Sequence, residues 1–377
     1  MKWEYKTLDQ LGTVSRGKSK HRPRNDPKLF GGKYPFIQTA DVKNADYYIT
    51  KYSDTYNESG LAQSKLWDKG TLCITIAANI ADTGVLAFPA CFPDSIMGFV
   101  PFEGVANTRF IKYCFDRLQR DCKQISQGTA QDNLSWEKLS TIKFCIPEYK
   151  EQCRIADILS AYDDLIENNQ KQIKLLEEAA QRLYKEWFVD LRFPGYENTK
   201  IVDGVPEGWS RTNINEILTF HRGYDLTRNE MKAGRYPVVG STTVIGYHNE
   251  FKIKGPGIVT GRSGSLGKYQ FIWDNFWPHN TSLYISDYKD HNIFFVYSLL
   301  QTVDFASLNN GGAIPTLNRN VLSNIEVIEP TDELQEMFAK IAEAQYRKTR
   351  NLEKQNNQLK MARDVLLPKL MSGEVEV

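Results

Sequence analysis

Basic side chains gather in one short segment near the start of the chain. Residues 16–24 hold five cations and no acidic residue, and glycine and proline interrupt the run. The cations are Arg16, Lys18, Lys20, Arg22 and Arg24. Such a loop is suited to contacts with phosphate groups, although a solvated loop without a ligand has the same composition. A second Arg-Gly pair at Arg222-Gly223 matches Arg16-Gly17, which favours a shared role for the two arginines.

A second polar turn follows a short β-rich run in the later half of the chain. Residues 260–268 place Arg262, Ser263 and Lys268 among glycines, an arrangement expected to leave backbone N–H groups free for a ligand. In the corresponding stretch of the first half, residues 77–84, Asn79 aligns with Arg262. Different side chains on one scaffold would read different bases, so both turns are candidate contacts with DNA.

Motifs of nucleotide-dependent and methyl-transferring enzymes are missing from the sequence. It has no G-x-x-x-x-G-K-[ST], no N/D-P-P-F/Y tetrapeptide, and no dinucleotide-binding spacing among the glycines of 255–261. Asp94 and Glu148 would make only a weak nuclease site, because a turn and a helix N-terminus explain them better. The five histidines, His21, His221, His248, His279 and His291, have no ligand spacing. We therefore expect no catalytic residue and no bound metal.

Length and charge indicate a neutral protein with at least two folded domains. The chain has 377 residues, and domains average roughly 150. With 47 Lys+Arg against 46 Asp+Glu the formal net charge is +1, so a nucleic-acid surface must be local or completed by a partner. No membrane-spanning stretch or signal-peptide core is present, which predicts a cytoplasmic protein. Six cysteines without a C-x-x-C pair are expected to be buried free thiols.

Two copies of one unit follow each other along the chain. Matches at a constant offset of 183 positions include Gly128 with Gly311, Leu134 with Leu317, Pro147 with Pro330 and Leu176 with Leu359. Upstream, Trp3 and Arg16 match Trp209 and Arg222 at an offset of 206, so the first copy is longer there by 206 minus 183, or 23 residues. Each copy has β-rich runs (71–76, 257–260), a helical piece (near 110–118 and 293–300) and then a long helix.

The long helices are the clearest elements. Apolar residues of the first recur in alternating four- and three-residue steps, which is the seam of a coiled coil. This seam comprises Ile155, Leu159, Tyr162, Ile166, Asn169, Ile173, Leu176, Ala180, Leu183 and Trp187. The second helix, from about 332 to 367, has a face marked by Phe338, Ile341, Ala342, Leu352, Leu359, Ala362 and Leu366, and its expected partner is the first helix. Asn169 would set the register at some cost in stability.

These elements predict an α+β fold with two tandem mixed α/β domains, each followed by a long helix. The expected boundaries are a first domain at 1–147, the central long helix at 148–192, a turn-rich linker at 193–208, a second domain at 209–330, and the C-terminal long helix and tail at 331–377.

Over essentially its whole length the sequence resembles the specificity subunits of Type I restriction-modification enzymes. The motifs that carry the resemblance are Gly128-Thr129 to Leu134, Pro147 to Gln152-x-x-Ile155, Leu183-Tyr184-x-x-Trp187-Phe188-Val189-Asp190, and Val205-Pro206-Glu207-Gly208-Trp209. The central helix and the stretch up to Trp209 are the most specific part. Residues 148–150, where the family commonly has prolines, and residues 329–335 depart from the pattern.

The resemblance implies a non-catalytic subunit with two target-recognition domains, each reading one half of a split DNA sequence. It implies that the two helices pair as an antiparallel coiled coil and set the gap between the halves. Two modification subunits, which methylate adenine, and two restriction subunits are the implied partners. S-adenosylmethionine, ATP and magnesium would belong to those partners, and no cofactor to this chain. Two alternatives stay open: a coiled-coil adaptor with repeated peptide-binding domains, and a self-sufficient DNA methyltransferase or nuclease.

Overall fold

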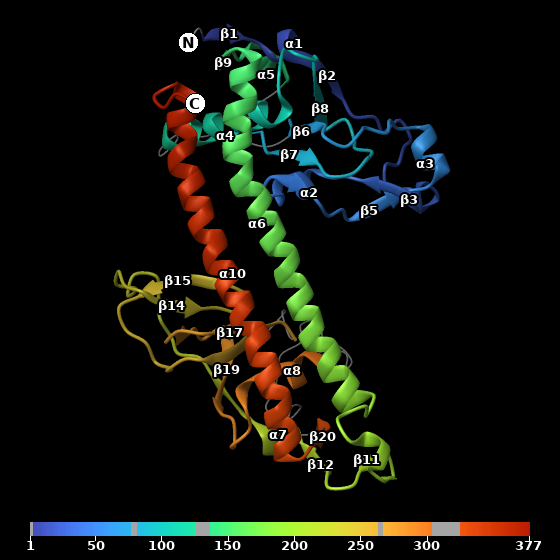
Figure 1. Ribbon diagram of the computed structural model, residues 1–377, viewed down its shortest axis with the longest axis vertical. Helices are drawn as coiled ribbons and strands as arrows, with labels where there is room; N and C mark the ends of the chain where they lie inside the picture. The colour runs from blue at the N-terminus through green and yellow to red at the C-terminus, as the bar shows by residue number, and fades with distance from the viewer. Residues whose placement is uncertain (1–2, 77–80, 126–135, 263–266, 304–324) are drawn as a thin grey trace. The chain divides into compact units, whose positions relative to one another are not determined.

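Contacts divide the chain into two compact units. The computed structural model describes residues 3–76, 81–125, 136–262, 267–303 and 325–377. Unit 1 comprises Met1–Asn169 with Lys354–Val377 and so contains both ends of the chain, while unit 2 comprises Gln170–Glu353. Each long helix contributes one part to each unit (Figure 1). The segment boundaries expected from the sequence, in which each helix stands alone, remain a prediction.

A five-stranded sheet forms the centre of unit 1. Its strand order is β2-β8-β6-β7-β4, and neighbouring strands are antiparallel except β4 and β7. The strands are β2 (Gly12–Arg16), β8 (Ile96–Pro101), β6 (Leu72–Thr75), β7 (Thr83–Leu86) and β4 (Tyr48–Ile49). Leu72 and Ile74 of β6 join the core that includes helix α4 (Thr108–Ile125), whereas Cys73 joins a second core with Trp67. Because side chains alternate along a strand, both faces of this sheet are covered.

Shorter elements complete the globular part of unit 1. They are α1 (Leu8–Leu11), η1 (Pro27–Leu29), α2 (Thr39–Lys43), α3 (Glu58–Ala62), α5 (Trp136–Thr141) and two antiparallel strand pairs, β1 (Glu4–Lys6) with β9 (Phe144–Ile146) and β3 (Phe30–Phe36) with β5 (Asp54–Tyr56). Strand β9 lies directly before the first long helix. Its pairing with β1 therefore brings the last strand of the globular part beside the first.

Unit 2 repeats the strand order of unit 1. Its main sheet, β13-β19-β16-β17, corresponds strand for strand to β2-β8-β6-β7. These strands are β13 (Thr219–Arg222), β19 (Ser282–Asp287), β16 (Gly257–Gly261) and β17 (Tyr269–Ile272). Likewise β12 (Ser210–Asn213) pairs with β20 (Glu326–Glu329) as β1 pairs with β9. The tandem mixed architecture predicted from the sequence is therefore confirmed.

Two helices and a three-stranded sheet complete unit 2, which has a core rich in aromatic rings. They are α7 (Ile214–Ile217), α8 (Ile293–Thr302) and a sheet of β15 (Val244–His248), β14 (Tyr236–Val239) and β18 (Trp277–Pro278). Phe188 lies edge-on to both Phe295 and Phe338, with ring centroids 5.4 and 5.3 Å apart. Edge-to-face pairs stabilise a core beyond the area that they bury.

The long helices pair within each unit and run antiparallel. The first, α6 (Tyr149–Tyr184), ends in a π-helical turn (Lys185–Val189), and the second is α10 (Asp332–Ser372). In unit 1 Asp163 contacts Arg363, and Asn169 bonds to Asn356. In unit 2 Tyr184 packs against Phe338. Residue numbers rise along α6 while those of its partners on α10 fall, which defines an antiparallel pair.

Most of the predicted seam is covered by this pairing. Ile155, Leu159, Ile166, Asn169, Ala180, Trp187, Phe338, Ala342 and Leu352 are buried, and Tyr162, Ile173, Leu176, Leu183, Leu359 and Leu366 are half-buried. The assignment of Ile341 and Ala362 to the buried face is wrong, since both are exposed. Each residue turns the helix by about 100°, so packing at Ala342 directs Ile341 towards solvent.

Residues 193–208, predicted as a turn-rich linker, fold as an anchored segment of unit 2. After a short 3-10 turn (Tyr196–Asn198), β10 (Ile201–Val202) and β11 (Val205–Pro206) form a hairpin. Its turn residues Asp203 and Gly204 have φ values of 51° and 76°, which glycine adopts readily. Phe193 at its start packs against Trp209, the residue that follows it, with ring centroids 4.7 Å apart and ring planes tilted by 40°. Packing therefore holds this segment in place.

Three of the described cysteines match the expectation of buried free thiols, and two are less buried than expected. Cys73, Cys91 and Cys114 are buried free thiols, and Cys145 and Cys153 are half-buried and free; the side chain of Cys122 lies outside the described part. Among the described residues, no helix combines the length and apolar character needed to cross a membrane.

Candidate nucleic-acid interface

An exposed arginine ends the first strand of the main sheet in both units. Arg16 ends β2 opposite Met97 of β8, and Arg222 ends β13 opposite Leu283 of β19. Strand pairing therefore gives the two arginines the same position in the repeated scaffold. Their equivalence, expected from the repeated Arg-Gly pair, is confirmed, while their role in binding remains a prediction.

The glycine after each arginine is required by a close backbone approach. A Cβ on Gly17 would lie 2.2 Å from the carbonyl oxygen of Phe92, and one on Gly223 would lie 2.1 Å from that of His279. Both distances are far shorter than van der Waals contact, and a backbone carbonyl cannot swing away. The Arg-Gly repeat thus has a structural cause that also fixes where each arginine leaves its strand.

The basic loop of unit 1 is held against the end of α3. The side-chain oxygen Oε1 of Gln63 accepts the backbone N–H groups of Lys20 and His21 at 2.6 and 3.0 Å, and Ser64 Oγ donates to the carbonyl of Lys18 at 2.7 Å. His21 also bonds to Asp26 at 2.9 Å. The loop therefore has a defined path, and its cations start from fixed backbone positions.

The five cations of this loop fall into two groups. Arg24 contacts both carboxylate oxygens of Asp94, at 2.7 and 2.8 Å, and Arg22 approaches the same carboxylate at 4.0 Å. By contrast, the exposed side chains of Arg16, Lys18 and Lys20 make no hydrogen bond or ion pair with any residue that the structure describes. The second group is therefore available to an anionic ligand.

The candidate residues of unit 2 are more dispersed. Arg222 lies 3.6 Å from Asp225 at an exposed position, Lys268 is exposed, and Arg262 is half-buried. The backbone N–H of Arg262 donates to the carbonyl of Thr281 at 3.1 Å, so the expectation of a free N–H group is wrong at this residue. Ser263 lies outside the described residues.

Strand pairing also corrects the alignment of the two polar turns. Ile76 N–H donates to Ser95 in unit 1 as Arg262 N–H donates to Thr281 in unit 2. Ile76, and not Asn79, is therefore the counterpart of Arg262. The offset here is 262 minus 76, or 186, between the values found upstream and downstream, because the two copies differ in loop length. Asn79 itself lies outside the described residues.

Residues weighed for metal or nuclease chemistry do not converge. Asp94 is occupied by Arg24, and the carbonyl of Glu148 accepts the N–H groups of Glu151 and Gln152 at the start of α6. The five histidines make separate contacts, with Asp26, Arg222, Lys232, Thr281 and Glu329. Over the ranges that the structure describes, no three His, Cys, Asp or Glu side chains are close enough to hold a metal ion.

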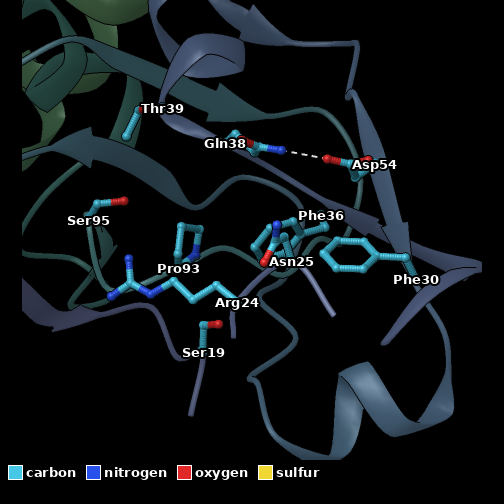
Figure 2. A pocket seen from close by; sticks show the side chains of 10 residues that line it. All are labelled: Ser19, Arg24, Asn25, Phe30, Phe36, Gln38, Thr39, Asp54, Pro93 and Ser95. Atoms are coloured by element: carbon cyan, nitrogen blue, oxygen red, sulfur yellow. Dashed lines mark hydrogen bonds between the residues drawn. The ribbon is translucent and has the colours of Figure 1, made fainter. Parts of the chain in front are cut away.

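A pocket of about 360 Å³ opens beside the basic loop (Figure 2). Its lining residues are Ser19, Arg24, Asn25, Phe30, Phe36, Gln38, Thr39, Asp54, Pro93 and Ser95. Figure 2 places the hydrogen-bonded pair Gln38 and Asp54 on one side and Arg24 and Ser19 on the other. Sequence reasoning missed this pocket, because strands and loops far apart in the chain contribute to it.

A buried charged cluster within the helix pair of unit 1 was also missed. The side chain of Asp163 is 1% exposed, accepts a hydrogen bond from Tyr113 Oη at 2.6 Å, and is ion-paired with Arg363. Burial raises the pKa of Asp163, and Arg363 counteracts this only in part. The signal was present in the sequence, since Asp163 and Arg363 both lie four residues after a seam leucine and three before the next seam residue.

Comparisons with known proteins agree on one family. Residues 1–178 and 206–361 match the family described as Type I restriction modification DNA specificity domain. The MjaIX specificity subunit of Methanocaldococcus jannaschii is 26% identical over 413 aligned positions, which cover 100% of this chain and 94% of that protein. The HindI specificity subunit of Haemophilus influenzae is 20% identical over 325 positions, covering 64% and 71%.

A solved structure shares the fold. The crystal structure of a Type-I restriction-modification S subunit from M. genitalium matches with a TM-score of 0.61 and 18% identity, covering 98% of this chain and 96% of that one. The family match extends over both units and most of the chain. The protein therefore belongs to the specificity subunits of type I restriction-modification systems, with two tandem target-recognition domains.

Proposed function

We propose that this chain is the non-catalytic DNA-recognition subunit of a type I restriction-modification complex, in which each unit reads one half of a split target. The observation that carries the proposal is a repeated pair of residues, Arg16-Gly17 and Arg222-Gly223, which we call the Arg-Gly corner. In each corner an exposed arginine ends an equivalent strand, in domains of a DNA-specificity family. One scaffold with two sets of loop side chains suits two different half-sites.

Within unit 1, Arg16, Lys18 and Lys20 are the proposed phosphate contacts, because they are exposed and have no described partner. Arg22 and Arg24 are already paired with Asp94, so they serve mainly to shape the loop. In unit 2, Arg222, Arg262 and Lys268 are the corresponding candidates. Since the net charge is only +1, partner subunits supply much of the positive surface around the duplex.

The proposed partners are two modification subunits, which methylate adenine, and two restriction subunits, acting together in the cytoplasm. S-adenosylmethionine, ATP and magnesium bind to those subunits. Support for docking on the helices comes from their exposed apolar side chains: within unit 1, Leu165 of α6 is 38% exposed, and Met361 and Val365 of α10 are 70% and 61% exposed. Large apolar side chains facing solvent on a helix are typical of a protein-binding surface.

Co-purification tests this docking surface. Met361→Asp combined with Val365→Asp should abolish capture of the modification subunits, because burying two unpaired carboxylates at an apolar interface is unfavourable. Gln358→Asp, on the same exposed helix segment, is the control and should be captured normally. Normal capture of the double variant would place the docking surface elsewhere.

The paired helices are proposed to set the gap between the two DNA half-sites. Inserting one heptad into α6 after Gln170 and one into α10 before Lys354 adds about 10 Å to each helix and keeps the seam in phase. Along B-DNA this corresponds to about three base pairs. The variant should select the same two half-sites with a wider gap. An assembled variant that keeps the original gap would contradict this role.

Selection from a random duplex library tests the function as a whole. The purified chain, with and without modification subunits, should enrich a split sequence whose two blocks are separated by unspecified bases. The chain alone should show no methyl transfer and no cleavage with any metal. Enrichment of nothing would support an adaptor, and turnover that survives purification would support a self-sufficient enzyme.

A further inference from the structure

The pocket beside the basic loop has an apolar side, formed by Phe30 and Phe36, and a polar side, formed by Gln38 and Asp54. Phe36 is 6% exposed and Phe30 is half-buried, and the two rings pack edge to face with centroids 5.9 Å apart. Gln38 donates its side-chain N–H to Asp54 on the polar side (Figure 2). A volume of about 360 Å³ lies at the small end of ligand pockets, which suits one planar ring system better than a larger ligand.

One buried hydroxyl in the pocket wall has no hydrogen-bond partner among the described residues. Ser19 is 5% exposed, and its hydroxyl makes no hydrogen bond with any residue that the structure describes. Buried polar atoms in native proteins are almost always hydrogen-bonded, so an unpartnered hydroxyl that lines a pocket points to a ligand atom. Ser19 belongs to the basic loop, between Lys18 and Lys20, which ties the pocket to the candidate DNA contacts.

The acceptor on the opposite side selects the chemistry of the ligand. One carboxylate oxygen of Asp54 accepts from Gln38, and the second has no partner among the described residues. A carboxylate accepts hydrogen bonds from an amino group and repels a phosphate. Arg24 does not reverse this preference, because Asp94 already holds its guanidinium.

We propose that this pocket receives one nucleobase that carries an exocyclic amino group and is rotated out of the DNA duplex. The ring would lie against Phe36, the amino group would donate to Asp54, and the hydroxyl of Ser19 would bond to a second polar atom of the base. Thymine has no amino group and can offer Asp54 only its ring N3–H, so it should bind less tightly. The inference rests on the proposed function and adds to it a capture site for a single base.

A mismatch scan of the selected target tests the pocket. The full chain is used alone, so that no partner can rotate a base, and each target position is mismatched in turn. At one position the mismatch should raise affinity about tenfold, because an unpaired base leaves the stack more easily. At the other positions mismatches should weaken binding. A mispaired thymine at the responsive position should give a smaller gain than a base with an amino group, and the fluorescence of 2-aminopurine placed there should rise several-fold.

Three variants identify the source of the gain. Ser19→Ala and Asp54→Asn should each reduce it to less than twofold, and Asp54→Asn should reduce the preference against thymine because an amide can donate. Glu58→Gln, an exposed neighbour that does not line the pocket, should keep the full gain. Ser19→Ala should leave the melting temperature of the free protein unchanged, which separates ligand capture from a folding role.

Other outcomes overturn the inference in distinguishable ways. If no position gains affinity, or if both pocket variants keep the gain, the pocket captures no base while the proposed function stands. If Ser19→Ala weakens all duplexes equally while Asp54→Asn, which removes a repelling charge, strengthens them, the pocket binds a phosphate. If the chain selects no DNA at all, the proposed function fails together with the pocket.

Discussion

The two units share their framework and differ at its periphery. Both have the same strand order and the same Arg-Gly corner, because strand pairing and a close backbone approach allow few alternatives. Unit 1 adds a fifth strand, an anchored basic loop and a pocket, whereas unit 2 adds the β15-β14-β18 sheet and an aromatic core. Backbone constraints therefore fix the framework of both units. The loops are not constrained in this way, so their side chains can differ and can contact different ligands.

The helix pair differs between the units in a second way. In unit 1 its interior holds polar partners, Asp163 with Arg363 and Asn169 with Asn356. In unit 2 the corresponding interior is aromatic, with Tyr184 and Phe188 around Phe338. Polar pairs define the register of a helix pair, whereas buried rings contribute most of its stability. Five expected outcomes test these contrasts.

Phe338→Ala should lower the free energy of unfolding by about 4 kcal/mol, because it empties a fully buried site surrounded by rings. Urea unfolding followed by tryptophan fluorescence measures the loss. Met337→Ala, at a 40% exposed neighbour, should change stability by less than about 0.5 kcal/mol. Equal losses in the two variants would contradict the aromatic anchor proposed for unit 2.

Asp163→Ala should cost about 3 kcal/mol at neutral pH, because it leaves the Tyr113 hydroxyl without its acceptor and leaves Arg363 paired with Asp364 alone. Asp164→Ala, whose carboxylate contacts Arg109 at the surface, should cost less than about 1 kcal/mol. If Asp164→Ala lowered the free energy of unfolding strongly and Asp163→Ala did not, Asp163 would not be the stabilising carboxylate of the helix pair.

The pH dependence of the Asp163 effect has a defined sign. Burial raises the pKa of Asp163 in the folded state, so folding favours its protonated form. This contribution is fully present below the pKa of an unfolded aspartate and is lost as pH rises through the folded pKa. The free energy of unfolding of the wild type should therefore fall relative to that of Asp163→Asn as pH rises over that window. Urea unfolding of both proteins at a series of pH values measures this, and a rise relative to the variant would contradict the direction.

Gly17→Ala and Gly223→Ala should each lower the stability of their own unit by about 2 kcal/mol, because the added methyl meets a backbone carbonyl. Limited proteolysis, with the fragments identified by mass, locates the loosened unit. Arg16→Ala and Arg222→Ala, one residue earlier, should leave the pattern unchanged. A response in only one unit would show that the two corners are not equivalent.

Arg16→Ala and Arg222→Ala should instead weaken DNA binding by about 1.5 kcal/mol each, one at each half-site. Titration of duplexes altered in a single half-site assigns each arginine to its half. A contact to phosphate would in addition lower the salt slope by about one. Unchanged affinity in both variants would leave the corners with a structural role alone.

Periodicity was sufficient to predict the helices, the repeat and most of the seam, because burial of an apolar stripe repeats at a fixed spacing. It assigned Tyr162 to the seam and omitted Asp163, although Asp163 is the more deeply buried of the two. A search for apolar residues cannot detect a buried carboxylate. The alignment of Asn79 with Arg262 failed because loop lengths change the offset between paired strands. The pocket could not be predicted, because Ser19 and Asp54 are far apart in the sequence and only the tertiary fold brings both into the lining of one pocket.

The segments that follow Trp3 and precede Val377 both lie in unit 1 and are in contact there. A Cβ on Gly373 would lie 3.1 Å from Trp3 Nε1, Arg154 bonds to the carbonyl of Val377, and Leu370 shares a core with Leu8. These two segments are therefore close enough in space for a short peptide to join them. A short peptide joining residue 377 to residue 3 should allow new ends to be opened in the hairpin turn at Asp203-Gly204. Such a circular permutant would carry its two target-recognition domains in the opposite order along the chain while folding to the same pair of units.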